Sequence, residues 1–318
     1  METKCNGLFG YLNMYAFEDF KSRGFSKEDA VIFGALSYLY FERIKINKPT
    51  LLKDLVKELK IINKGSIEQK RNPALFRKII KTKRYEKVKV CFAKVIEDKD
   101  KNIQFGAVTF LLDNGLNVVA FRGTTLKSCG WIENLNMSVY RKTKCQEYGV
   151  KYLRKVSSKL EGNFIVLGHS KGGNTAIYAS MNQQIKVKQR IEKIYDLDGP
   201  GFKDDIYKSK DFKDIENKTI KIITKNDIVG SLLCTYSKFI VVDCYMFSLF
   251  THDLYNWKFE CGKLKIIDKI SNNAKKRNYY INKFINSLTI QEKKDIINFL
   301  NRLIIKNKAL LKFIEYRQ

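Results

Sequence analysis

Short apolar runs alternate with polar or helical segments through the middle of the chain. The runs FIVLG (164–168), IEKIYDL (191–197) and TIKIITKND (219–227) are each short enough to be one strand. Before them, QFGAVTFLLDNGLNVVAFRG (104–123) joins two apolar runs through Asp-Asn-Gly, a pattern typical of a β-hairpin. Alternation of strand and helix predicts a mostly parallel sheet with helices on both faces. We therefore expect an α/β fold.

Both ends of the chain are predicted to be helical. Near the N-terminus, Ser26 and Asp29 form a capping-box pattern ahead of apolar residues at helical spacing. Near the C-terminus, Thr289 and Glu292 form a second such pattern. We expect three parts in one compact unit: an N-terminal helical segment over 1–85, an α/β core over 86–260 and a basic helical segment over 261–318.

The composition supports a folded core that needs no metal or cofactor. Hydrophobic residues make up 44% and aromatic residues 13% of the 318 residues, which excludes a disordered chain. The seven cysteines show no close paired spacing, and only two histidines are present, which argues against a zinc site. We expect no cofactor and no metal.

Three features bear on where the protein is found. An odd, scattered cysteine count is typical of reduced thiols in the cytoplasm. The first residues, METKCNGLFGYLNMYAFEDF, show no basic segment followed by an apolar core, so we expect no signal peptide. No uncharged apolar run approaches the roughly 18 residues of a membrane span. We expect a cytoplasmic protein that is at most peripheral at the membrane.

The net charge is +27, from 60 basic and 33 acidic residues. Such a surplus favours anionic partners, although codon composition alone also produces lysine-rich surfaces. From Lys263 to Gln318 there are 14 basic and four acidic residues, and a basic amphipathic helix can lie on a membrane. We favour a core role for its apolar stripe, and peripheral contact with an anionic membrane stays a hypothesis. Binding of nucleic acid is less expected, and the sequence leaves the oligomeric state open.

Gly168-His169-Ser170-Lys171-Gly172 fits the pattern G-x-S-x-G, the nucleophile elbow. A serine on a tight strand-to-helix turn needs very small neighbours, and Gly173 adds another. An apolar run precedes the motif and TAIYASM continues it as a helix, which is the context that an elbow requires. The alternative is an ordinary hydroxyl where a strand meets a helix.

A nucleophilic serine needs a general base and an acid that orients the base. His169 adjoins the serine and is expected to pack beside the elbow, which leaves His252 as the candidate base. Asp227 ends a predicted strand and is the preferred acid, because sites of open α/β sheets lie at that edge. Asp198, in YDLDGPGF, is the alternative acid, and a loop role for His252 stays open.

Acyl transfer also requires donors for the oxyanion. The main-chain amide of Lys171 is one candidate, because it follows the nucleophile. Thr124, in the Arg-Gly-Thr-Thr that ends an earlier predicted strand, is the second. That segment could equally be a plain polar turn.

The chain resembles the class 3, fungal-type lipases of the α/β-hydrolase superfamily. FRGTT with a downstream tryptophan, GHSKGG, a glycine-proline turn, Asn-Asp at a strand end and a late histidine occur in the family's order. DAVIFGALSYLYF, GWIENLNMS, GHSKGGNTAIYAS and YDLDGPGF are similar to a bacterial lipase-like branch, over roughly Ser26 to Phe259. Lys171 departs from the small or apolar residue common after the serine in secreted lipases.

This resemblance implies an α/β-hydrolase fold in which Ser170 is the nucleophile, Asp227 the acid and His252 the base. It implies Thr124 and Lys171 as oxyanion donors. It also implies a lid at about 126–140, with an apolar face that could equally be fixed core and comprises Trp131, Ile132, Leu135 and Met137.

The expected function is hydrolysis of a carboxylic ester, with a lipid acyl ester as the expected substrate. A second hypothesis is a catalytically inactive hydrolase-fold protein that binds an anionic partner, either membrane or nucleic acid. A third keeps the same catalytic residues for thioester hydrolysis or acyl transfer. Fold likeness alone does not choose among these reactions.

Overall fold

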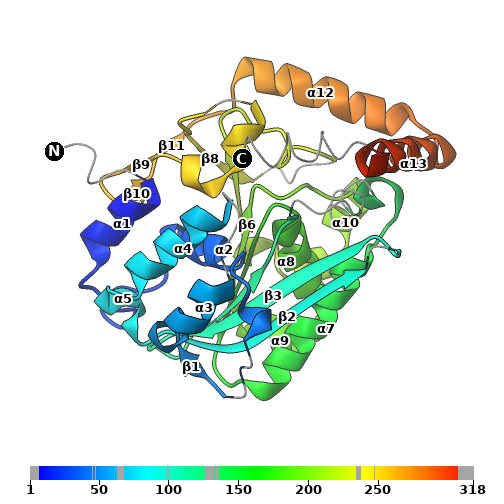
Figure 1. Cartoon of the computed structure of the whole chain (residues 1–318). Coiled ribbons are helices and arrows are strands. Elements are labelled where there is room, and N and C mark those ends of the chain that lie inside the picture. The colour runs from blue at the N-terminus through cyan, green and yellow to red at the C-terminus, as the bar shows by residue number, and fades with distance from the viewer. Residues whose placement is uncertain are drawn as a thin grey trace.

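A nine-stranded sheet runs through the protein in the order β1-β2-β3-β4-β5-β6-β7-β8-β11 (Figure 1). This computed structural model describes residues 7–306 except 45, 47, 63–67, 99, 126–132, 134–135, 234–237 and 247. The strands of the sheet are β1 (Thr50–Leu51), β2 (Lys89–Asp98), β3 (Ile103–Leu111), β4 (Asn117–Phe121), β5 (Phe164–His169), β6 (Ile191–Leu197), β7 (Thr219–Thr224), β8 (Phe239–Val242) and β11 (Ile266–Ile267). A separate pair is formed by β9 (Phe259–Glu260) and β10 (Lys263–Leu264).

The central strands β4 to β8 are parallel, as the alternation of strand and helix predicts. The edges are antiparallel: β1, β2 and β3 precede β4 in the sheet, and β11 lies beside β8. The hairpin predicted around Asp-Asn-Gly is the β3–β4 pair, in which Leu111 faces Asn117. Gly115 has φ +87° in its turn, a conformation that favours glycine. The α/β prediction is confirmed.

Helices cover both faces of the sheet. Successive residues of β4 alternate between two cores: Val118 and Ala120 belong to one, and Val119 and Phe121 to the other. In Figure 1 the N-terminal helices lie on one face, and α7, α8 and α9 lie on the other. The helices are α1 (Gly7–Tyr15), α2 (Lys27–Leu36), α3 (Val56–Ile62), α4 (Glu68–Ile79), α5 (Lys83–Glu86), α7 (Lys144–Lys159), α8 (Lys171–Met181), α9 (Ile185–Arg190), α10 (Asp204–Lys208), α11 (Lys210–Lys213), α12 (Asn272–Ser287) and α13 (Ile290–Lys306).

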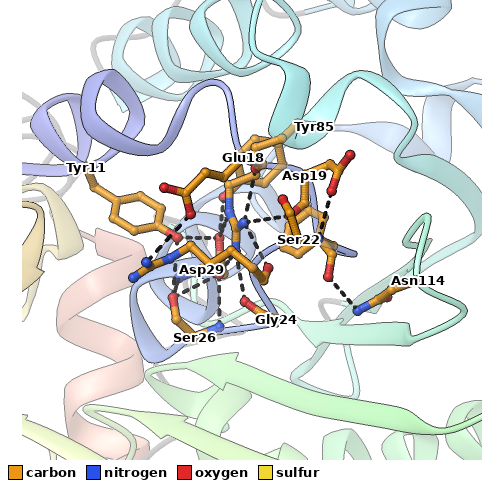
Figure 2. Close-up of polar contacts among 12 residues, drawn as sticks. Tyr11, Glu18, Asp19, Ser22, Gly24, Ser26, Asp29, Tyr85 and Asn114 are labelled. Atoms are coloured by element: carbon orange, nitrogen blue, oxygen red, sulfur yellow. Dashed lines mark hydrogen bonds and ion pairs between the residues drawn. The ribbon is translucent and has the colours of Figure 1, made fainter.

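A buried polar cluster holds the N-terminal helices together (Figure 2). Asp29 is fully buried and pairs with Arg84, whose Nη2 lies 2.6 Å from Asp29 Oδ2. The hydroxyls of Tyr11 and Tyr85 donate to Asp29 Oδ1 at 2.8 and 2.9 Å. Ser26 and Asp29 form the predicted capping box of α2. The carboxylate therefore both caps a helix and satisfies a buried guanidinium, as burial of a charge requires.

The C-terminal helices lie outside the sheet, with α12 across the top of the view in Figure 1. Thr289 and Glu292 form the predicted capping contacts of α13: the Glu292 amide donates to Thr289 Oγ1 at 3.2 Å and the Thr289 amide donates to Glu292 Oε2 at 2.7 Å. Ile297 of the predicted apolar stripe is buried against Val139. Among the described residues, no helix is both long enough and apolar enough to cross a membrane.

Candidate active site

Ser170 sits on a strained turn between β5 and α8. Its φ of +58° and ψ of −131° lie outside the conformations that side-chain-bearing residues normally adopt. Its amide donates to the Leu197 carbonyl at 2.9 Å, and its carbonyl accepts from the Gly173 amide at 2.8 Å. The strand, the tight turn and the helix are the context predicted for a nucleophile elbow.

The glycines around Ser170 are required because main chain approaches them closely. A Cβ on Gly168 would overlap the Gly172 carbonyl, and one on Gly172 would overlap the carbonyl of Phe121 in β4. A Cβ on Gly173 would overlap the carboxylate of Asp196. The predicted supporting role of these three positions therefore has a steric basis.

His169 precedes Ser170 in the elbow, and each of its two ring nitrogens forms a hydrogen bond. Its Nδ1 lies 2.8 Å from the Tyr38 hydroxyl, and its Nε2 lies 2.8 Å from the His252 carbonyl oxygen. Burial, with His252 nearby, holds the pKa of His169 well below its usual range. The neutral ring therefore links the Tyr38 segment and the His252 loop to the elbow.

His252 contacts Asp198 and not the preferred acid, Asp227. Its Nδ1 lies 2.7 Å from Asp198 Oδ2. The His252 ring packs on the His169 ring at 4.6 Å between centroids, which places it next to the elbow. Within the part of the chain that the structure describes, no hydrogen bond joins the Ser170 hydroxyl to His252. Such contacts often form only when substrate is bound.

Asp198 reaches His252 because of its own backbone. Its φ is +57°, which is unusual for a residue with a side chain, and the turn Gly199-Pro200-Gly201 follows it. This conformation directs the carboxylate toward His252 at the end of β6. The glycine-proline turn that follows Asp198 in the sequence is therefore part of what positions it.

Asp227 lies next to Asp198, and both carboxyls approach Gly230. It is fully buried, its Oδ1 accepts from the Gly230 amide at 2.7 Å, and its Oδ2 accepts from the Ser231 hydroxyl. Its carboxyl is close enough to that of Asp198 for the two groups to shift each other's pKa. The prediction that Asp227 orients His252 is therefore corrected: both aspartates follow adjacent parallel strands, but Asp198 is the one in contact with the imidazole.

Burial sets the ionisation of this cluster. Burial lowers the pKa of His252 to about 4, although the nearby carboxylates act to raise it. The imidazole is therefore neutral at pH 7. Burial raises the pKa of Asp198 to about 7. It raises the pKa of Asp227 well above its usual range, and the neighbouring Asp198 adds to that increase. A neutral imidazole is the form that a general base requires.

The loop after β4 lies against the elbow. A Cβ on Gly123 would come within 3.0 Å of Ser170 Cβ, so this loop and the serine are in contact. Thr124 is the next residue and is half-buried. Arg122 at the start of this loop is held in place, because its guanidinium donates to the carbonyls of Ser37 and Leu39 at 2.7 and 2.9 Å. Thr124 therefore directly follows a residue in contact with the serine, and Lys171, the first residue of α8, directly follows the serine itself.

The side chain of Lys171 has a structural partner. It is fully buried, and its Nζ donates to Glu133 Oε2 at 2.8 Å and to the Gln104 carbonyl at 2.6 Å. Glu133 also accepts from the amides of Gln104 and Cys145 at 3.0 and 2.8 Å. Of the expected lid, Trp131, Ile132 and Leu135 lie outside the described residues, whereas Glu133 and Met137 are buried.

We expect Lys171→Met to lower the free energy of unfolding by about 3–5 kcal/mol, because it leaves the Glu133 carboxylate buried without its cation. Urea unfolding measures the change. The double variant Lys171→Met/Glu133→Gln should recover part of the loss, since no buried charge is then left unpaired. The exposed pair Lys144–Glu147, at 2.9 Å, is the matched control, and Lys144→Met should leave stability unchanged. Equal losses in Lys171→Met and the double variant would contradict this account.

The buried ion pair between Lys221 and Asp196 supports the site and is not among the residues predicted from the sequence. Lys221 of β7 is fully buried and donates to Asp196 Oδ2 at 2.7 Å and to the Gly199 carbonyl. Asp196 Oδ1 accepts from the Gly199 amide at 2.8 Å, so the pair shapes the turn that follows Asp198. The position of Lys221 in the middle of the apolar strand TIKIIT is the sequence feature that indicates a buried partner. Among the described residues, no group of histidine, cysteine or acidic side chains could hold a metal ion.

Comparison with solved structures finds lipases at low identity. A structure of M37 lipase is 17% identical, with 65% of this chain and 69% of that chain covered and a TM-score of 0.41. A fungal lipase is 14% identical, with 82% and 87% covered and a TM-score of 0.46. A mutant form of MDLA from Penicillium cyclopium is 14% identical, with 75% and 83% covered and a TM-score of 0.42. A search of curated proteins found no match.

In the comparison with family models, the Mbeg1-like model matches residues 79–302. The match includes the sheet from β2 to β11, the elbow and the His252 loop, and therefore well over half of the chain. The chain belongs to the Mbeg1-like family, with a lipase-like α/β-hydrolase fold.

Proposed function

We propose that the protein is a serine hydrolase that cleaves carboxylic esters through an acyl-enzyme. Ser170 is the nucleophile, His252 the general base and Asp198 the acid that orients it. One observation carries the proposal: the strained elbow serine follows His169, whose ring packs on His252, and His252 Nδ1 is 2.7 Å from the buried Asp198. This is the arrangement that serine hydrolases on unrelated folds share.

The reaction follows from these positions. Ser170 Oγ attacks the ester carbonyl while His252 Nε2 takes the hydroxyl proton. Asp198 accepts from Nδ1–H and stabilises the imidazolium that forms. The imidazolium then protonates the leaving alcohol, and a water activated by the same nitrogen releases the acid. The amides of Thr124 and Lys171 are the proposed donors to the oxyanion.

A lipid acyl ester is the proposed substrate class. The support for this class is the resemblance to class 3 lipases in the segments FRGTT and GHSKGG. Thioester hydrolysis and acyl transfer use the same residues and form the second candidate.

Turnover of nitrophenyl esters tests the proposal. The wild-type protein should hydrolyse short-chain nitrophenyl esters with an initial burst of nitrophenol, because acyl-enzymes accumulate when deacylation is slow. A series of acyl chain lengths and a matched thioester would show which substrate is preferred. Absence of turnover above the uncatalysed rate, for esters and thioesters alike, would refute the proposed function.

We expect kcat/KM to fall as the pH is lowered through about 7. The active form has Asp198 ionised and His252 neutral. Because burial raises the pKa of Asp198 to about 7, the first proton bound by the pair inactivates it near that pH. Therefore kcat/KM is at its maximum above pH 8, and below pH 7 it falls about tenfold for each pH unit, as binding of a single proton requires. A profile that stays flat down to pH 5 would contradict this ionisation scheme.

A further inference from the structure

The carboxyl groups of Asp198 and Asp227 are buried against each other without a cation between them. Asp198 Oδ1 is inaccessible to solvent and accepts no hydrogen bond from any N–H or hydroxyl of the described residues. A Cβ on Gly230 would lie 2.6 Å from Asp198 Oδ1 and 3.1 Å from Asp227 Oδ1, so both oxygens converge over that glycine. Neither carboxyl forms an ion pair with lysine or arginine in the described part of the chain. Two adjacent buried carboxylates in this state would repel each other.

The surrounding groups indicate where a proton is held. The amine of Lys221 acts on Asp198 from nearby, but it is hydrogen-bonded to Asp196 and to the Gly199 carbonyl. His252 occupies the other oxygen of Asp198. Asp227 receives donors from Gly230 and Ser231 and is the neighbour of the unsatisfied Asp198 Oδ1. A proton on Asp227 supplies the missing donor.

We propose that Asp227 is a positioning residue that stays protonated and donates a hydrogen bond to Asp198 Oδ1. Asp198 then stays ionised toward His252, and its second oxygen is satisfied. Arg277 and Asn278 of α12 hold this arrangement from outside, because both donate to the Asp227 carbonyl, at 2.5 and 3.2 Å. This inference rests on the proposed function for its catalytic consequence, but the proton itself can be measured without turnover.

Asp227→Asn and Asp227→Ala separate the roles. Asparagine keeps an N–H donor toward Asp198, so we expect kcat/KM at pH 8 to fall by no more than about threefold. The acid limb should stay close to its wild-type position, because the amide keeps the donor that the protonated carboxyl supplies in the wild type. Alanine leaves Asp198 Oδ1 without a donor, and we expect at least a tenfold loss with the limb moved to higher pH. A loss in Asp227→Asn as large as in Asp198→Asn would overturn the proposal.

Unfolding provides the readout that needs no activity. A carboxyl whose pKa is raised in the folded state binds its proton more tightly when folded, so wild-type stability should fall as pH rises from 5 to 8. Asp227→Asn should make that fall in the urea midpoint clearly smaller, leaving the part that Asp198 contributes. An unchanged dependence on pH would overturn the proton assignment, even if the protein had no esterase activity.

A second, independent observation concerns the outer face of α12. Six residues, Lys275, Lys276, Tyr279, Tyr280, Lys283 and Phe284, occupy one half of the helix circumference and are exposed. Tyr279, Tyr280 and Phe284 are 61%, 66% and 59% exposed. The helix contains no acidic residue. Exposed aromatic side chains interleaved with lysines form a surface that is complementary to a partner with both apolar and negatively charged groups.

We infer that the α12 outer face binds an anionic phospholipid surface. Lysines attract acidic head groups, and tyrosine rings are stable at the boundary between head groups and acyl chains. A second copy of the chain is a poor partner for this face, because it would bring the same cations into contact. The inner face of α12 touches the Asp227 loop through Arg277, Asn278 and Asn282. Binding would therefore bring the candidate site close to lipid esters.

Vesicle co-sedimentation with Ser170→Ala protein tests binding apart from catalysis. We expect binding to phosphatidylserine–phosphatidylcholine vesicles that weakens with salt, and little binding to phosphatidylcholine alone. Lys275→Gln/Lys276→Gln should weaken it about 25-fold, since each lysine near the surface contributes about fivefold. Tyr280→Ser/Phe284→Ser should weaken it at least tenfold.

The matched control is Lys155→Gln/Lys159→Gln on α7, at the opposite end of the view in Figure 1, and it should change affinity less than twofold. Circular dichroism checks that each variant is folded. Equal loss in the control variant would overturn the assignment to α12. So would binding of duplex DNA in place of vesicles, or a dimer that Tyr280→Ser/Phe284→Ser dissociates while vesicle binding is absent.

Discussion

Replacing Ser170 by alanine is expected to lower kcat for a short-chain nitrophenyl ester by about 10⁶-fold. The hydroxyl is the only group that the proposed mechanism uses to form the acyl-enzyme, and loss of a triad serine removes nearly all of the contribution of the triad. The residual rate should be that of the oxyanion donors and substrate binding. Steady-state turnover with highly purified protein measures the change.

The control for this variant is Ser158→Ala. Ser158 is exposed on α7 and donates only to the Lys155 carbonyl, so its removal should leave kcat unchanged. Ser170→Gly should lose as much activity as Ser170→Ala but gain about 1 kcal/mol of stability, because glycine tolerates φ +58°. Comparable activity in wild type and Ser170→Ala would remove Ser170 from the mechanism.

Replacing Asp198 by asparagine is expected to lower kcat/KM by about 10³–10⁴-fold. The amide oxygen can still accept from His252 Nδ1–H, so the geometry is preserved. The loss arises because a neutral amide no longer stabilises the imidazolium and permits the wrong tautomer. Assays at pH 8, where Asp198 is ionised in the wild type, give the full difference.

The same variant should be more stable than the wild type at high pH. Because the pKa of Asp198 is raised from 3.8 to about 7, folding resists its ionisation, and wild-type stability falls as pH rises through that window. Asparagine removes the contribution of Asp198 to that fall, so Asp198→Asn should gain about 4 kcal/mol at pH 8 and little at pH 4. Urea unfolding at the two pH values checks the sign. Lower stability at both would contradict the buried-carboxylate account.

Local signals predicted the parts of the fold that depend on short segments. The β3–β4 hairpin and the elbow at Ser170 follow from Asp-Asn-Gly and G-x-S-x-G, because each turn needs a backbone conformation that few residues tolerate. The antiparallel edge strands β1 and β11 have two residues each and carry no detectable alternation. They exist because their neighbours in the sheet offer unpaired main-chain groups.

The choice between Asp198 and Asp227 shows where sequence reasoning ends. Both residues follow apolar runs that end at the same edge of the sheet, and order along the chain allows either. The difference is the positive φ of Asp198, which follows from tertiary packing of the Gly-Pro-Gly turn. Lys171 is a similar case, because its partner Glu133 lies 38 positions away in a segment without a strand or helix pattern.

Covalent labelling with a fluorophosphonate probe tests the central claim most directly. The probe phosphonylates a serine only when a neighbouring base and oxyanion donors activate it. We predict one adduct per chain, mapped to Ser170 by peptide mass spectrometry, absent in Ser170→Ala and strongly slowed in Asp198→Asn. No adduct on folded wild-type protein, or one that persists in Ser170→Ala, would contradict the assignment of Ser170 as an activated nucleophile.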